Sequence, residues 1–171
     1  GKGLFTAELE SALRSGDIDL AVHSLKDLPT ENPEGLVLGA VPARVDPRDA
    51  LVGCSLDQLP EGAVVASGSV RRRMQIRTLR PDLVLADIRG NVRTRIQKVD
   101  DEHCVATILA MAGLKRLEVD RPDVFPLSVA QMVPAPGQGA LGVQCRENDV
   151  RTLGYLSHID HAETRMCVDG E

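Results

Sequence analysis

Between Ala63 and Leu117 the sequence repeats one pattern three times: a short apolar run, a break that is twice rich in small or polar residues, and a run with helical spacing. Strands that alternate with helices in this way are typical of a parallel sheet covered by helices. We therefore predict an α/β fold. The predicted strands are 63–66, 83–88 and 105–109, and the predicted helices are 70–79, 92–99 and 112–117.

The segments on either side of these repeats predict a second substructure. Two stretches rich in turn-forming residues, 42–49 and 133–140, separate it from the repeats and predict two crossings of the chain. Because the last helical pattern stops abruptly at Glu171, we expect the chain to be a fragment. The elements predicted outside the repeats are a helix over 6–15, strands over 18–23, 36–41 and 141–144, and a helix from Arg151 onward.

Eight arginines lie between Arg71 and Arg95, against two acidic residues, although the net charge of the whole chain is -5. The planar fork of arginine favours bidentate binding of carboxylate or phosphate groups. In parallel sheets, ligands bind at the carboxyl ends of the strands, where helix N-termini offer free N–H groups. The arginines fall at that edge, so we predict a site for an anionic ligand. The alternative is a solvated helix face.

Composition disfavours other classes of site. Aromatic residues make up 2% of the chain, which leaves few platforms on which nucleic-acid bases stack. No stretch approaches the ~18 apolar residues of a membrane span, and the first ten residues lack a secretion signal, so a cytoplasmic location is expected. The four cysteines and four histidines lack metal-ligand spacing. We predict reduced thiols and no metal site.

The predicted strand 18–23 leads into the run from Ser24 to Pro29, which contains Lys26 and Asp27. A lysine beside a carboxylate at a strand end suits a site in which the cation holds an anionic substrate while the carboxylate exchanges protons or stabilises positive charge. In a non-catalytic receptor for an organic anion, which is the alternative, Asp27 would repel the ligand. His23 is predicted to be a hydrogen-bonded structural residue rather than a proton shuttle.

Eight short motifs run through the chain: GKGLF from Gly1, AVHSLKDLP from Ala21, DPRDA from Asp46, SVRR from Ser69, RGNV from Arg89, TR from Thr94, AGLKRL from Ala112 and PGQGA from Pro136. In their order and spacing, over nearly the whole chain, they resemble the porphobilinogen deaminase family.

The resemblance implies a transferase of tetrapyrrole and haem biosynthesis, which joins porphobilinogen units head to tail into hydroxymethylbilane and releases ammonia. It implies two α/β lobes of type II periplasmic-binding-protein-like architecture, with a dipyrromethane cofactor in the cleft between them, and a third α/β domain. On this basis residues 1–44 with 134–157 belong to domain 1, residues 45–133 form domain 2, and residues 158–171 begin domain 3. We expect a monomer that acts on porphobilinogen without nucleic acid or membrane.

The resemblance also implies roles for single residues. Asp27 is implied as the catalytic carboxylate, which assists the loss of ammonia and stabilises positive charge on the pyrrole system. Gly68 stands where the family usually has serine. The residues implied to hold the carboxylates of cofactor and substrate are Lys2, Ser24, Lys26, Ser67, Ser69, Arg71, Arg72, Arg89, Gly90, Asn91, Arg95, Arg116, Gln138 and Gly139.

Two features of the family are absent from the sequence. The family attaches its cofactor through a thioether to a cysteine in a third-domain loop, and that Gly-Gly-Cys-like loop does not occur here. Cys167 precedes its expected place, lies in helix-like sequence, and is predicted to be a buried structural cysteine. The N-terminal strand is also missing. The chain is therefore expected to be the middle of the enzyme, with the third domain largely absent.

Overall fold

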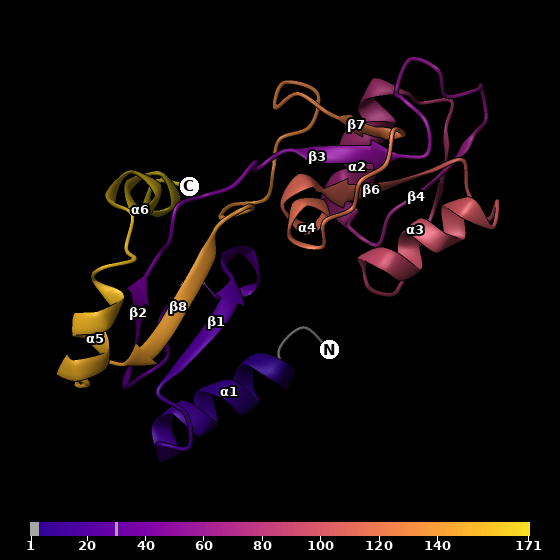
Figure 1. Ribbon diagram of the computed structural model, residues 1–171. Helices are drawn as coiled ribbons and strands as arrows, with labels where there is room; N and C mark the ends of the chain where they lie inside the picture. The colour runs from indigo at the N-terminus through magenta and orange to yellow at the C-terminus, as the bar shows by residue number, and fades with distance from the viewer. Residues whose placement is uncertain (1–3, 30) are drawn as a thin grey trace. The chain divides into compact units, whose positions relative to one another are not determined.

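The computed structural model describes residues 4–29 and 31–171 and has two compact units (Figure 1). Unit 1 comprises residues 1–45 and 136–171, and unit 2 comprises residues 46–135. The chain therefore passes between the units twice, near residues 45 and 135. Residues 158–171 make their contacts within unit 1, and their assignment to a third domain stays a prediction.

Unit 1 is built on a three-stranded antiparallel sheet in the order β1-β8-β2. Helix α1 packs on one face against Ala21 and Leu36, and helix α5 packs on the other against Val143 and Cys145 (Figure 1). The faces separate because successive side chains of a strand point to opposite sides. The elements are α1 (Leu4–Ser15), β1 (Leu20–Ser24), a 3₁₀ turn η1 (Leu25–Asp27), β2 (Leu36–Ala40), β8 (Leu141–Arg146), α5 (Val150–Leu156) and α6 (Ala162–Asp169).

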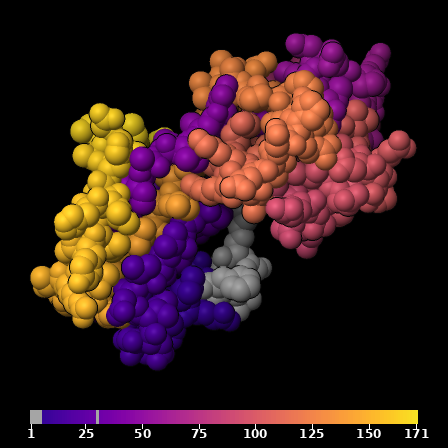
Figure 2. All heavy atoms as spheres, viewed as in Figure 1, coloured from indigo at the N-terminus to yellow at the C-terminus, as the bar shows by residue number. Residues whose placement is uncertain are grey.

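Helix α6 is tied to the sheet by an aspartate in the loop before it. Asp160 Oδ1 accepts a hydrogen bond of 2.7 Å from the backbone N–H of Val41, and Arg165 donates to both oxygens of the same carboxylate at 2.8–3.0 Å. The Arg165 guanidinium, together with the Val41 N–H, lowers the pKa of Asp160. In the space-filling view α5 and α6, in yellow, cover one side of unit 1 (Figure 2).

Replacing Asp160 by Asn is expected to lower the free energy of unfolding by about 1–3 kcal/mol at neutral pH, because the Arg165 guanidinium loses its charged acceptor. A lowered pKa in the folded state means that the carboxylate stabilises the fold above the ordinary aspartate pKa of about 3.9 and ceases to do so as the pH falls through the folded value. Urea unfolding of parent and variant from pH 7 to pH 2 measures this. The difference should shrink below about pH 4, whereas Asp169→Asn, on an exposed residue of the same helix, should show little difference at any pH.

Unit 2 contains a five-stranded sheet in the order β5-β4-β6-β3-β7. Helix α2 packs on one face through Ile76, and helices α3 and α4 pack on the other through Ile96 and Leu114. The elements are β3 (Asp49–Val52), β4 (Val64–Ala66), α2 (Val70–Leu79), β5 (Val84–Ala86), α3 (Val92–Asp100), β6 (Ala106–Ala110), α4 (Met111–Arg116) and β7 (Val124–Pro126).

The α/β class is confirmed, and the three strands predicted from the repeats do pair in parallel; the antiparallel strands beside them were not predicted. Strand β4 pairs in parallel with β5 and β6, whereas β3 pairs antiparallel with both β6 and β7. Strands β3 and β7 are not among the predicted elements, because β3 follows the turn-rich run at Asp46 and β7 is only three residues long and ends in proline. The prediction of a single helix from Arg151 onward is wrong, because the helical conformation is interrupted between Leu156 and Ala162. His161 caps the second helix, its Nδ1 accepting from the Thr164 N–H.

Two predictions for single residues need correction. Cys167 is exposed rather than buried, because it lies on the outer face of α6, whereas Cys104 and Cys145 are buried. His23 is buried on β1, but its Nε2 has no hydrogen-bond partner among the residues described, so the predicted hydrogen bond is wrong for that atom. In residues 4–29 and 31–171, no helix is both long and apolar enough to cross a membrane.

Candidate functional site

The Lys26-Asp27 pair lies on the 3₁₀ turn that directly follows β1, and both side chains are exposed. The turn is fixed at its start, where the Leu25 N–H donates to the Ala140 carbonyl at 3.1 Å. A glycine makes room for the Leu25 side chain: a Cβ on Gly137, whose φ is +66°, would lie 3.1–3.3 Å from three atoms of Leu25. The turn is thus anchored by packing behind it, which leaves the Asp27 carboxylate at the surface.

Gln138 and Gly139 connect this turn to the chain segment that leaves unit 1. Gln138 is buried; its Oε1 accepts from Lys26 Nζ at 3.5 Å, and its backbone carbonyl accepts from Arg44 Nε at 2.9 Å. The Gly139 carbonyl accepts from the Val45 N–H at 3.2 Å. Ser24, the last residue of β1, is half-buried and pairs with Leu141. Lys26, Gln138 and Gly139 therefore share one connected network within unit 1.

In unit 2 an ion-pair cluster lies at the edge of the sheet where β4 and β6 end. The Asp49 carboxylate, which is fully buried, accepts from Arg71 Nη2 through Oδ2 at 2.7 Å and from Arg72 Nη2 through Oδ1 at 2.7 Å. Asp49 reaches this edge because β3 runs antiparallel to β6 and pairs its first residue with Ala110, the last residue of β6. Sequence reasoning assigned no role to Asp49, although the acid lies within the quoted DPRDA motif.

The start of helix α2 forms the next part of the cluster. Ser69 occupies the N-cap position but its side chain makes no capping hydrogen bond, and its own N–H donates to the buried Ser67 Oγ at 3.2 Å. Free first-turn N–H groups favour an anion there. Gly68 lies between the two serines. A Cβ at this position would lie 2.8 Å from the Ile88 carbonyl oxygen, so only glycine fits there without a shift of the backbone. The glycine is thus a consequence of close backbone packing.

The start of helix α3, unlike that of α2, is capped by a side chain. Asn91 Oδ1 accepts from the Thr94 N–H at 2.9 Å, so the Asn91 side chain is the helix cap. Arg95 Nε donates to the carbonyl of Gly90 at 2.8 Å, and Arg89 is 92% exposed. Burial lowers the pKa of Arg95, and the Arg72 cation lowers it further. A partly desolvated guanidinium near a second cation is a favourable place for a carboxylate.

The structure therefore gathers Arg71, Arg72 and Arg95 with Ser67 and Ser69 in unit 2. Asn91 and Gly90 shape the backbone beside them. Arg116 is exposed in the last turn of α4, and Lys2 lies outside the described residues.

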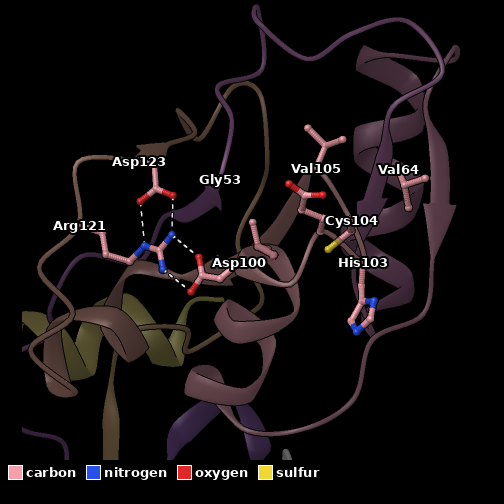
Figure 3. A pocket seen from close by; sticks show the side chains of 10 residues that line it. Gly53, Val64, Asp100, His103, Cys104, Val105, Arg121 and Asp123 are labelled. Carbon is pink, nitrogen blue, oxygen red and sulfur yellow. Dashed lines mark hydrogen bonds and ion pairs between the residues drawn. The ribbon is translucent and has the colours of Figure 1, made fainter.

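A separate pocket of about 570 Å³ lies at the opposite edge of the same sheet, beside Gly53, Val64 and Val105 (Figure 3). In its wall the Arg121 guanidinium lies between two carboxylates and donates to Asp123 and Asp100 at 2.7–2.9 Å. Arg121 lowers the pKa of both carboxyl groups. Within the described ranges no three histidine, cysteine or acidic side chains group as metal ligands. The cluster links α3 to the loop before β7.

The family model and the curated relatives agree on one family. The family model for porphobilinogen deaminase, dipyromethane cofactor binding domain, matches residues 1–154. A porphobilinogen deaminase of Syntrophotalea carbinolica is 49% identical over 174 residues, which is 100% of this chain and 55% of that protein. One of Brevibacillus brevis is 48% identical over 174 residues, again 100% of this chain and 56% of that protein. The chain thus spans about half the length of the curated relatives it matches.

Solved structures of low sequence identity share the fold. The BenM effector binding domain with its effector benzoate aligns with a TM-score of 0.52 at 12% identity, over 94% of this chain and 74% of that one. The reduced form of the OxyR regulatory domain from Pseudomonas aeruginosa aligns with a TM-score of 0.50 at 16% identity, over 95% of this chain and 79% of that one. The chain has the type II periplasmic-binding-protein-like fold.

Proposed function

Because this chain belongs to the porphobilinogen deaminase family, we propose that the protein containing it joins porphobilinogen molecules head to tail into hydroxymethylbilane and releases one ammonia at each step. The observation that carries this proposal is the cluster of Arg71, Arg72 and Arg95 beside the uncapped start of α2. Porphobilinogen carries acetate and propionate side chains, and such carboxylates are what guanidinium forks and helix N–H groups bind.

The matched family model is that of a dipyrromethane-binding domain, and the residues present fit such a group. A dipyrromethane carries the same carboxylate side chains, so Arg71, Arg95 and Ser69 would hold it, supported by the buried Arg72 and Ser67. When bound, it would supply the terminal pyrrole to which the first porphobilinogen is joined. The lowered pKa of Arg95 supports the fit, because that guanidinium has lost part of its hydration and gains from an anionic partner.

Asp27 and Lys26 supply the other function that the reaction needs. Loss of ammonia from porphobilinogen leaves positive charge on the pyrrole and its methylene carbon, and a carboxylate held beside it stabilises that charge as it develops. The rigid support of the turn by Leu25 and Gly137 keeps the carboxylate from relaxing away. Lys26, whose Nζ is oriented by its hydrogen bond to Gln138 Oε1, would bind a substrate carboxylate and keep that carboxylate apart from Asp27.

We propose further that the protein works in the cytoplasm as a monomer, with a small molecule rather than nucleic acid as its partner. The net charge of -5 and the aromatic content of 2% support this choice of partner, because nucleic-acid binders combine positive charge with stacking side chains.

The direct test is to incubate the full-length protein with porphobilinogen and to measure both ammonia and linear tetrapyrrole. One ammonia is expected for each porphobilinogen consumed, and intact mass spectrometry should show a covalent dipyrrole on the purified protein. Ammonia release without a linear tetrapyrrole, or no consumption at all, would contradict the proposal.

Replacing Arg95 by Lys in the full-length protein is expected to raise the KM for porphobilinogen or to reduce cofactor loading by about tenfold, since lysine keeps the charge but not the fork. The measurements are steady-state kinetics and intact mass. Arg77→Lys, on an exposed residue of α2, is the matched control and should behave like the parent. Equal kinetics for parent and Arg95→Lys would favour a solvated helix face.

A further inference from the structure

Asp49 stands out because it is a fully buried carboxylate shared by two arginines of the proposed site. Its two oxygens are divided between them: Arg71 Nη2 donates to Oδ2 at 2.7 Å, whereas Arg72 Nε and Nη2 donate to Oδ1 at 3.1 and 2.7 Å.

The two arginines differ in what else holds them. Arg72 is 6% exposed and also donates from Nη1 to the Ile108 carbonyl at 3.2 Å, so its guanidinium is fixed inside the unit. The Arg71 side chain is 26% exposed, and its second anchor is the Val133 carbonyl at the rim. In the described part of the chain, Arg71 Nε makes no hydrogen bond. The Arg71 side chain therefore stays partly exposed, with an Nε donor that the described residues leave unused.

We infer that Asp49 is a positioning residue, which fixes the guanidinium of Arg71 so that its outer edge receives a pyrrole carboxylate while Arg72 serves as an internal support. This inference rests on the proposed function. The geometry explains how the cations are kept together. The guanidiniums of Arg71, Arg72 and Arg95 would repel one another. The buried Asp49 carboxylate offsets part of that repulsion and leaves the net charge of these four side chains positive. An arginine fork binds its ligand more tightly when its orientation is set before the ligand arrives, because less conformational entropy is then lost on binding.

The test is a double-mutant cycle in the full-length protein, with porphobilinogen as the probe. Asp49→Asn is expected to reduce kcat/KM by roughly ten- to fiftyfold, mainly through KM, as Arg71→Gln is. If Asp49 acts through Arg71, adding Asp49→Asn to Arg71→Gln should change kcat/KM by no more than about twofold. Binding of porphobilinogen to the same variants in an Asp27→Asn background, measured by calorimetry, should show the same coupling without turnover.

A control separates positioning from stability. Asp123→Asn removes one carboxylate from the doubly paired Arg121 at the opposite edge of unit 2, so it should lower Tm and leave kcat/KM near the parent value. Asp49→Glu keeps the charge but displaces it; it should fold even if Asp49→Asn does not, and it should still raise KM. Additive losses in the cycle, or a parent-like KM for Asp49→Glu, would overturn the inference alone. A full-length parent that does not consume porphobilinogen would instead refute the proposed function.

Discussion

Replacing Asp27 by Asn in the full-length protein is expected to lower kcat for porphobilinogen consumption by about 10²–10³-fold, while porphobilinogen binding changes little. Asparagine keeps the size and the polar character of the side chain but removes the negative charge. Since the exposed Asp27 carboxylate has no hydrogen bond or ion pair within the described residues, the substitution leaves no partner unsatisfied in the fold. The loss should therefore fall on the chemical step.

Single-turnover kinetics and calorimetry distinguish these effects. A rate loss at unchanged affinity shows that an interaction made only in the transition state has been removed. Glu8→Gln, on an exposed carboxylate of α1 in the same unit, is the matched control and should keep the parent rate. A near-normal kcat for Asp27→Asn would show that another group stabilises the charge.

Gly53→Ala is expected to have the largest effect on stability, a loss of about 3–5 kcal/mol in the free energy of unfolding. Gly53 follows β3 with a φ of +111°, a conformation that residues with a Cβ rarely adopt. The added Cβ would also lie 2.5 Å from the Val105 carbonyl oxygen and 2.6 Å from Val99 Cγ1. Because the first of these atoms belongs to the backbone, the conflict cannot be relieved by a rotamer change.

The matched control is Gly62→Ala in the same unit. Gly62 also has a positive φ, of +72°, but no atom lies within 4 Å of the position that an alanine Cβ would take there. Its substitution therefore isolates the cost of the backbone conformation, about 1–2 kcal/mol. Urea unfolding followed by circular dichroism compares the two variants. Equal losses would mean that the contact with Val105 relaxes at little cost.

Local patterns in the sequence predicted much of unit 2. The apolar runs and turn residues of the repeats predicted helices α2 and α3 almost to the residue, because Ser69 and Asn91 at the N-cap positions and Pro81 mark their ends. The turn that carries Asp27 was also expected at a strand end, because Pro29 stops regular pairing.

The antiparallel strand β3 could not be read from the same patterns. Its four residues are all buried, so they show no alternation, and their partners in β6 lie nearly sixty residues further along the chain. The role of Asp49 depends entirely on that pairing, which brings the first residue of β3 beside the last residue of β6. Asn91 shows the converse: its function as a helix cap follows from a local preference for Asn at that position, whereas the ligand contact implied by the family resemblance stays a prediction.

The central position of β8 in the sheet of unit 1 has a consequence for the order in which the protein is made. Strands β1 and β2 each pair with β8, which begins only at Leu141, and not with each other. On a ribosome, which adds about 5–20 residues per second, all of unit 2 is synthesised before β8, the strand with which β1 and β2 pair. All five strands of the unit 2 sheet lie within residues 46–135, so we expect unit 2 to fold before unit 1, and the turn that carries Asp27 to become rigid only after β8 has paired.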